Sequence, residues 1–218
     1  MFKRPTIILN LIIQLSLSHT VLAEEPFNPF THIILGDAPT RYILNQNNDD
    51  YIEVTALGEL SASGLYLDIT ELKDTYINDY PNFSWSWRVD KYQSDADISI
   101  KGKDDYAASL HFVFGKKSLF SKPKVLAYAW VGNDEEIGSV ISSPRAKNHF
   151  RTIVLENKNS PLEEFLTYER NLIEDFKLAY GMYPEKALSS FGLFTDNDQT
   201  SEEVKSIYRI YINNESFN

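Results

Sequence analysis

Aspartates are the residues of this sequence whose spacing most suggests chemistry. They form three short clusters beside expected strand ends: Asp95 and Asp97, Asp104 and Asp105, and Asp196 and Asp198. Carboxylates that meet in space can hold a hard cation, or they can act as acid and base in glycoside hydrolysis when their separation suits it. The sequence leaves a third interpretation open, in which each cluster only caps a turn and stays solvated.

The turn from Asp196 to Thr200 is the strongest candidate for a cation. Asp196, Asp198 and Thr200 place side-chain oxygens at alternate positions, and oxygens are the ligands that Ca²⁺ prefers. The turn is not an EF-hand, because Ser201 stands where that loop needs glycine and Ile207 where it needs glutamate. We predict a structural Ca²⁺ held by Asp196, Asp198 and Thr200, with a solvated acidic turn as the alternative.

Arginines near these segments could complete a binding site. An arginine paired with a carboxylate inside the fold is the commoner arrangement, and one that awaits a ligand is the alternative. We predict that five residues bind ligand: Asp104, Asp105, Arg88, Arg145 and Arg170. Trp85 and Trp87 could stack on a sugar, but they share one face of an alternating segment, so we expect them in the core.

Other kinds of site find little support in the sequence. The absence of cysteine excludes disulfides, thiolate zinc sites, iron–sulfur clusters and cysteine nucleophiles. No Gly-x-Ser-x-Gly, His-Glu-x-x-His, Walker or Gly-x-Gly-x-x-Gly motif is present. His32, His111 and His149 are far apart in the sequence, and we expect His111, on the polar face of its strand, at the surface.

The elements that must position these side chains are mostly strands. Residues 83–89 and 108–114 alternate between apolar and polar, and residues 125–131 are apolar on both faces, as in a central strand. We expect further strands at 41–44, 51–57, 64–69, 98–101, 150–155, 188–195 and 204–212. About ten short strands separated by turns predict a mainly β fold, a two-sheet jelly-roll β-sandwich.

One amphipathic helix is expected over residues 161–180. Ser160 could cap it, Pro161 suits its first turn, and Gly181 would end it. Its apolar residues recur at helical spacing: Leu162, Phe165, Leu166, Leu172, Ile173, Phe176, Ala179 and Tyr180.

Residues 1–23 show the pattern of a cleaved signal peptide. Lys3 and Arg4 precede an apolar stretch at 7–17, and Ala23 ends a cleavage motif. The stretch is shorter than a membrane span and is interrupted by polar residues. We expect a single domain over residues 24–218, exported to the bacterial periplasm, with no membrane span after cleavage.

The charge of the chain argues against nucleic acid as a partner. There are 21 Lys+Arg against 31 Asp+Glu, a net charge of −10, whereas a nucleic-acid binder normally shows a basic face. Loss of Lys3 and Arg4 with the signal peptide would make the remainder more acidic.

Six short motifs occur along the chain in a recognisable order: Ser61–Leu65, Trp85–Val89, Asp104–Ala108, Tyr128–Trp130, Glu169–Asn171 with Asp175, and Thr195–Thr200. In this order they resemble the bacterial exported family called domain of unknown function 3047, over about residues 40–212. Phe165 and Gln199 depart from that pattern, which weakens the transfer of any site. The resemblance implies a jelly roll similar to galactose-binding-like and carbohydrate-binding modules, and it implies no established activity.

These observations predict a periplasmic jelly-roll binding module for carbohydrate or another cell-envelope ligand. One alternative is a glycan-acting enzyme that uses paired carboxylates. The other is an envelope interaction protein without a small-molecule ligand. Convergence of the Asp104 and Asp196 clusters in an open cleft would favour the enzyme, whereas burial against Arg88 or Arg170 would make the carboxylates structural.

Overall fold

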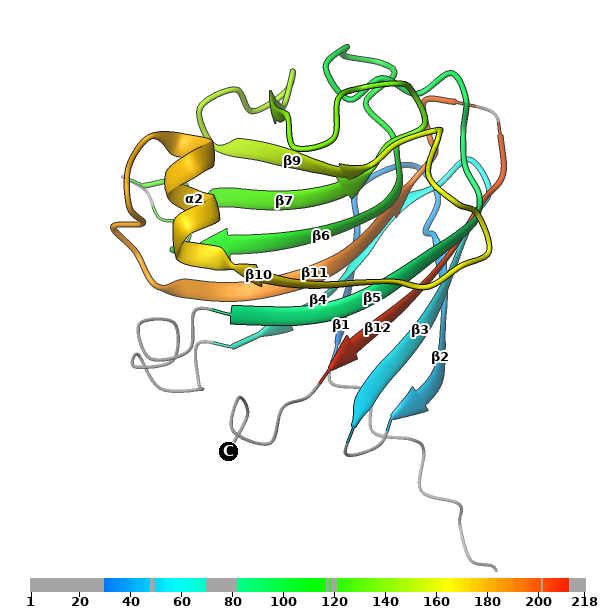
Figure 1. The fold of residues 1–218 in the computed structure, drawn as a ribbon, viewed down its shortest axis with the longest axis horizontal. Coiled ribbons are helices and arrows are strands. Elements are labelled where there is room, and N and C mark those ends of the chain that lie inside the picture. The colour runs from blue at the N-terminus through cyan, green and yellow to red at the C-terminus, as the bar shows by residue number, and fades with distance from the viewer. Residues whose placement is uncertain are drawn as a thin grey trace, which may run out of the picture.

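The alternating segments of the sequence form the strands of two sheets (Figure 1). The structure is a computed structural model, and it describes residues 30–47, 50–69, 82–116, 118, 121–200 and 202–211. The expected signal peptide, residues 1–23, lies outside the described residues. The strands are β1 Thr31–Ile34, β2 Arg41–Asn47, β3 Tyr51–Gly58, β4 Ala62–Asp68, β5 Asn82–Lys91, β6 Tyr106–Phe114, β7 Lys124–Trp130, β8 Val140–Ser142, β9 Phe150–Glu156, β10 Leu166–Asn171, β11 Leu188–Asp196 and β12 Val204–Tyr211.

The two sheets differ in size and pack as a sandwich. The seven-stranded sheet has the order β1-β4-β11-β6-β7-β9-β8, and the five-stranded sheet has the order β10-β5-β12-β3-β2. Strands β7 and β9 are parallel, and the other described pairs are antiparallel. The predicted two-sheet jelly-roll β-sandwich is confirmed.

The core lies between the sheets and is rich in aromatic side chains. Trp85, Trp87 and Trp130 are fully buried there, the first two as predicted, and Trp85 packs against Trp87 with ring centroids 5.7 Å apart. Burial of such large rings supplies much of the driving force for folding in a chain without disulfides.

A second apolar cluster covers the outer face of the seven-stranded sheet. Its buried members are Ile98, Tyr106, Ala129, Val131, Val154 and Phe194. The loops before β6 and around β8 lie over this face, so β6 and β7 are buried on both sides. The expectation of a surface position for His111 is therefore wrong: the residue is 4% exposed, and its ring packs against those of Phe150 and Phe194.

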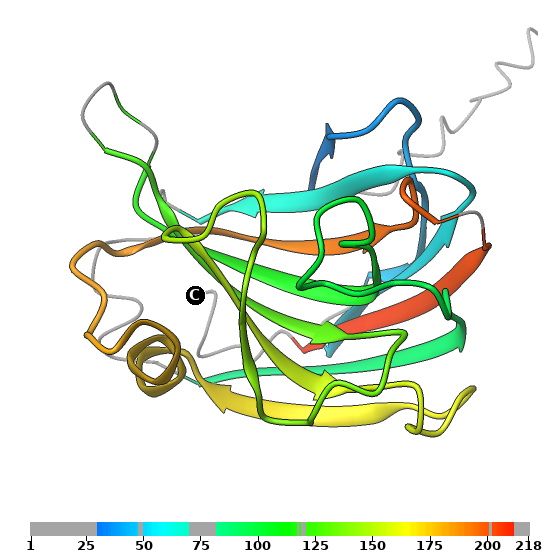
Figure 2. The same cartoon turned by 90° about the horizontal axis from the view of Figure 1, so that it is seen from above.

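The helix is shorter than the apolar spacing predicts. Helix α2 spans Leu172–Tyr180, and Asn171 caps its start by accepting hydrogen bonds from two backbone N–H groups. Gly181, with φ of 71°, ends it in the left-handed conformation, as predicted. Figures 1 and 2 place α2 at one end of the sandwich.

The first half of the expected helix, residues 161–171, is not helical. Strand β10 occupies Leu166–Asn171 and pairs with β5, where Leu166 lies opposite Trp87 and Tyr168 lies opposite Trp85. As a strand, β10 pairs with the otherwise open edge of β5, and Tyr168 stacks on Trp85 with ring centroids 5.4 Å apart. These long-range contacts override the local helical spacing.

The expected strand at residues 98–101 is wrong, and two short strands were not expected. Residues 98–101 form turns, because the Asp97 carboxylate accepts hydrogen bonds from the backbone N–H and the hydroxyl of Ser99. Strands β1 and β8 were not predicted, and both lie at edges of the seven-stranded sheet.

The described residues contain no helix that is long and apolar enough to cross a membrane.

Candidate functional site

A cleft of about 300 Å³ opens on the outer face of the seven-stranded sheet. Acidic, basic, hydroxyl and aromatic side chains share its wall: Leu35, Ala62, Tyr66, Asp104, Tyr106, His111, Ser143, Arg145, Ala146, Phe150, Phe194, Asp196 and Asp198. We call it the carboxylate cleft. Residues from two of the three aspartate clusters, far apart in the sequence, therefore meet at one place.

Three carboxylates form the most acidic part of this region. Asp105, Asp196 and Asp198 each offer an oxygen, and these oxygens all lie within 4.8 Å of one another. Asp105 directly precedes β6, Asp196 ends β11, and Asp198 lies in the turn that follows. Because β6 and β11 are neighbours in the sheet, their pairing brings the two segments together. We call these three residues the acidic triad.

The turn that carries Asp196 and Asp198 is fixed by a buried asparagine. Asn197 is fully buried, and its Oδ1 accepts hydrogen bonds from the backbone N–H and the hydroxyl of Ser61 at 3.0 and 3.3 Å. Its Nδ2 donates to the carbonyls of Gly58 and Glu202 at 3.1 and 2.8 Å. A turn with all four bonds made has little freedom, so Asp196 and Asp198 are held in place.

Asp105 is held from the opposite side by the same turn. Its carboxylate accepts hydrogen bonds from the backbone N–H groups of Gln199 and Thr200 and, at 2.8 Å, from the Thr200 hydroxyl. The proposed calcium ligand Thr200 therefore points its hydroxyl at Asp105. In this structure Thr200 anchors the triad.

Burial next to like charges perturbs the acidity of the triad. Desolvation, followed by repulsion from Asp105 and Asp198, raises the pKa of Asp196 to about 9. Desolvation also raises the pKa of Asp105, although the hydrogen bonds from Thr200 oppose that effect. At neutral pH the triad therefore favours a proton on Asp196, or a cation beside it.

Asp104 has the opposite character within the same cleft. Burial alone would raise its pKa, but hydrogen bonds from Arg145 and from the Gly102 N–H lower the pKa below its usual value. The Arg145 guanidinium donates from Nε and Nη2 to the two carboxylate oxygens, at 2.5 and 2.9 Å. The side chain of Arg145 remains 48% exposed, so the pair presents a charged, accessible wall.

The other two predicted arginines lie outside the cleft. Arg88, on β5, forms an ion pair with Asp90 at 2.5 Å. Arg170, on β10, binds both oxygens of Asp175, which also accepts a hydrogen bond from the buried Tyr128 hydroxyl at 2.6 Å. Both arginines are thus engaged by carboxylates of the fold, and neither faces the Asp104 or Asp196 cluster.

Most of the neutral lining of the cleft belongs to no motif in the sequence. Tyr66, His111, Phe150 and Phe194 are its principal aromatic residues, and the Tyr66 hydroxyl lies 2.8 Å from His111 Nδ1. Alternation in β4 and β11 places Tyr66 and Phe194 on the outer face. These residues line the cleft because loops cover the outer face of the sheet. No local sequence pattern reveals this cover.

His111 should make the protein sensitive to acid. Burial lowers its pKa to about 3, from an unfolded value of about 6.5. Because the folded pKa is depressed, the unfolded state takes up the proton first, and stability falls as the pH drops from about 6.5 towards 3. Between pH 7 and pH 5 we expect wild type to lose about 2 kcal/mol more unfolding free energy than His111→Asn, as measured by urea denaturation. Equal losses in the two proteins would contradict this assignment.

Comparisons with solved structures find only remote similarity. The xyloglucanase domain of NopAA from Sinorhizobium fredii, solved with cellobiose, aligns at 9% identity and a TM-score of 0.43, covering 83% of this chain and 90% of that one. The family 11 xylanase from Neocallimastix patriciarum aligns at 10% identity and a TM-score of 0.33, covering 83% and 96%. No curated protein matches the sequence.

A family profile, by contrast, covers the whole described domain. The match extends over residues 30–211, from the residue before β1 to the end of β12. It includes the motifs that build the carboxylate cleft, namely Ser61–Leu65, Asp104–Ala108 and Thr195–Thr200. The chain belongs to the family described as "Protein of unknown function (DUF3047)".

Proposed function

We propose that this protein is a binding module whose carboxylate cleft takes a hydroxyl-rich ligand, a carbohydrate or another component of the cell envelope. The observation that carries the proposal is the convergence of Asp104, Asp196 and Asp198 with Arg145 in one open cleft. Their carboxylates can accept hydrogen bonds from ligand hydroxyls, and the guanidinium can donate to ligand oxygens.

The aromatic wall supports the same class of ligand. Tyr66, Phe150 and Phe194 give the cleft apolar surface in addition to its charged residues. Sugars present C–H faces as well as hydroxyl edges, so they suit a cleft with both apolar and polar surface. The volume of about 300 Å³ is at the lower end of ligand pockets, which favours a short or terminal residue of a larger molecule.

We further propose that the acidic triad holds Ca²⁺ as a structural cation. Ca²⁺ binds oxygens at about 2.3–2.6 Å, so two ligands across the ion lie about 5 Å apart at most. The triad oxygens, all within 4.8 Å of one another, fit that requirement. A divalent cation would offset the repulsion that raises the pKa of Asp196 and would fix the wall of the cleft.

Binding of Ca²⁺ should release a proton. Asp196, with a pKa of about 9, is protonated at pH 7, and a cation at the triad must displace that proton. We expect titration calorimetry at pH 7, in two buffers of different ionisation enthalpy, to report about one proton released per Ca²⁺. Affinity should rise with pH up to about 9, and binding without proton release would contradict the assignment.

A glycan array probed with the purified protein, with and without Ca²⁺, tests the ligand class. Arg145→Gln should lose the signal, because it removes the exposed donor of the cleft. Arg88→Gln is the matched control, since it removes a paired arginine on the other sheet and should keep the signal. A blank array would overturn the carbohydrate proposal and favour an envelope interaction protein.

A glycan-acting enzyme is the second candidate, and one observation favours it. Asp196 and Asp104 line the same cleft with pKa values shifted in opposite directions, which is how a protonated acid and an ionised carboxylate are set apart in glycosidases. Release of reducing ends from envelope glycans by wild type, and its loss in Asp196→Asn, would establish this activity.

We place the protein in the bacterial periplasm, on the strength of the signal-peptide pattern in residues 1–23. Fractionation of cells that produce the full sequence, with determination of the mature N-terminus, tests this placement. Retention of the whole chain in the cytoplasm would contradict it.

A further inference from the structure

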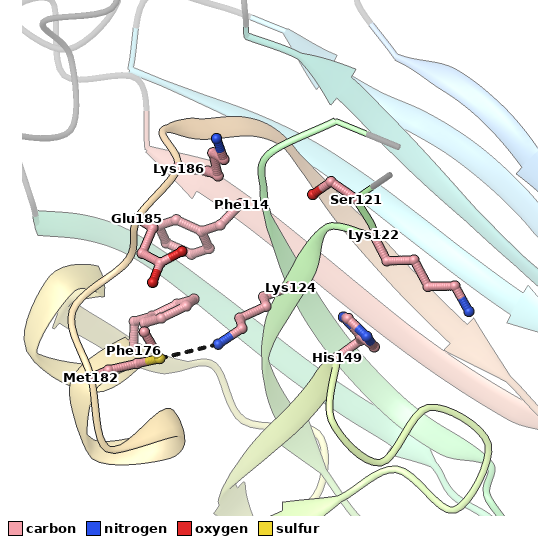
Figure 3. Close-up of a pocket in the computed structure, with 9 residues that line it drawn as sticks. All are labelled: Phe114, Ser121, Lys122, Lys124, His149, Phe176, Met182, Glu185 and Lys186. Carbon is pink, nitrogen blue, oxygen red and sulfur yellow. Dashed lines mark hydrogen bonds between the residues drawn. The ribbon is translucent and has the colours of Figure 1, made fainter. Parts of the chain in front are cut away.

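A second pocket, of about 260 Å³, lies at the end of the sandwich beside α2 (Figure 3). It is bounded by the end of β6, the start of β7, α2 and the segment that leads into β11. Nine residues line it: Phe114, Ser121, Lys122, Lys124, His149, Phe176, Met182, Glu185 and Lys186. We call it the lysine pocket. It shares no residue with the carboxylate cleft.

The lysine pocket is positive although the chain as a whole is strongly negative. Three lysines and one glutamate line it, against a net charge of −10 for the chain. The ion pairs among the described residues involve none of Lys122, Lys124 and Lys186. A group of cations without carboxylate partners attracts anions, most effectively inside a concave, partly apolar site.

Lys124 is the cation best placed to contact a ligand. Its Nζ lies 3.3 Å from Met182 Sδ, a weak acceptor, and 4.8 Å from the centre of the Tyr180 ring. An ammonium group has three donors, so most of its hydrogen-bonding capacity is left for a ligand. Figure 3 shows Lys124 directed across the pocket towards Met182 and Phe176, whereas the ends of Lys122 and Lys186 point outward.

His149 forms another wall of the lysine pocket. Its Nδ1 is buried and has no hydrogen-bond partner among the described residues. Figure 3 shows its ring on the opposite side of Lys124 from Met182. His149 therefore contributes to the wall of the pocket, and its buried Nδ1 is not a contact for a ligand.

The floor of the pocket is apolar and its walls are firmly connected. Phe114 and Phe176 are 2% and 1% exposed, and their ring centroids lie 4.7 Å apart. The Tyr180 hydroxyl donates to the Val125 carbonyl at 2.7 Å, which ties α2 to β7. The Val125 N–H donates to the His149 carbonyl at 2.7 Å, which ties the segment before β9 to β7. The site is therefore formed before a ligand arrives.

We propose that the lysine pocket binds a small anion that carries an apolar body. The carboxylate or phosphate head would take hydrogen bonds from Lys124, and the apolar part would lie against Phe114, Phe176 and the Met182 thioether. A volume of about 260 Å³ equals the share of about nine liquid waters, which suits a molecule of benzoate size. This site is independent of the carboxylate cleft.

Titration of the purified protein with benzoate, phenyl phosphate and benzamide, followed by NMR, tests the proposal. We expect at least one of the two anions to bind with a dissociation constant of about 1 mM and to shift signals of residues around the pocket. Benzamide has the shape of benzoate without its charge, so it should bind about tenfold more weakly. The two anions distinguish a carboxylate head from a phosphate head.

Variants of Lys124 separate charge recognition from pocket shape. Lys124→Gln should weaken binding of the anion about tenfold, and Lys124→Arg should restore it. Lys101→Gln, an exposed lysine in the loop before β6, is the control and should change nothing. Absence of binding by both anions, equal binding of benzamide, or unaltered binding by a folded Lys124→Gln would each overturn the proposal.

Discussion

Replacement of Asp196 by asparagine should stabilise the protein, although it removes a charged residue from the candidate site. The folded pKa of about 9 lies far above the unfolded value of about 3.8, so folding at neutral pH requires Asp196 to take up a proton or to bury a charge. Asparagine has nearly the shape of the protonated acid, and its Oδ1 can still accept the Asp198 N–H. We expect the unfolding free energy at pH 7, without Ca²⁺, to rise by about 2 kcal/mol.

The pH dependence makes this prediction specific. A carboxyl group whose pKa is raised by folding stabilises the folded state most at pH values below its unfolded pKa. This stabilisation is lost as the pH rises towards 9. The advantage of Asp196→Asn should therefore grow from pH 5 through pH 7 to pH 8.5, as measured by urea denaturation with chelator. Asp95→Asn, an exposed aspartate outside the cleft, should show no such trend. A variant less stable than wild type at pH 8.5 would contradict the assignment.

Calcium should reverse the order of the two proteins. If the triad binds Ca²⁺, only wild type gains binding free energy, and the gain increases with the ligand concentration relative to the dissociation constant. At saturating Ca²⁺ wild type should then unfold at the higher temperature. If Ca²⁺ leaves both melting temperatures unchanged, the cation proposal fails while the proton assignment of Asp196 stands.

Local sequence patterns predicted the strands well because burial on one face leaves a period of two. Strand β3 alternates between half-buried and buried along its whole length, and Trp85 and Trp87 point into the core as their spacing requires. The pattern failed where both faces are covered. His111 follows the polar alternation of β6, but the loops over the outer face bury it.

The helix boundary shows a second limit of local pattern. Leu162, Phe165 and Leu166 continue the helical spacing of α2, yet Asn171 is the residue that caps the helix. Residues 166–171 form a strand because they pair with β5, which lies about 80 residues earlier in the chain. A sequence pattern that spans the length of one helix therefore cannot predict this pairing.

The site was predictable in its residue types and not in its assembly. The acidic clusters at Asp104–Asp105 and Asp196–Asp198 were recognisable as candidates, and sheet pairing brings them together. Their separate roles depend on contacts between distant segments. Thr200 binds Asp105 across 95 residues, and Arg145 binds Asp104 across 41 residues. Arg88 and Arg170 have the same residue type but lie elsewhere, each with its own carboxylate.

Asn197→Ala should have the largest effect on stability and should disrupt the acidic triad. The substitution removes four hydrogen bonds and leaves the Ser61 N–H and the Gly58 carbonyl without their partner in a buried place. Each unsatisfied buried group costs about 1–3 kcal/mol, so we expect a loss of about 3–5 kcal/mol in urea denaturation at pH 7. Gln199→Ala, in the same turn but exposed, should lose less than about 0.5 kcal/mol. A loss below 1 kcal/mol for Asn197→Ala would contradict the assigned role.

Gly58 supplies an independent test of the same contact. A Cβ at Gly58 would lie 2.8 Å from Asn197 Oδ1, so Gly58→Ala should push the asparagine out of position and destabilise the protein. In the Asn197→Ala background that clash is gone, and the added methyl group keeps only an ordinary contact with Ser61 Oγ at 3.4 Å. The two substitutions should therefore be less than additive, by more than about 1 kcal/mol in a double-mutant cycle. Strict additivity would show that the turn is held by other contacts, and the position of Asp196 and Asp198 would then need another cause.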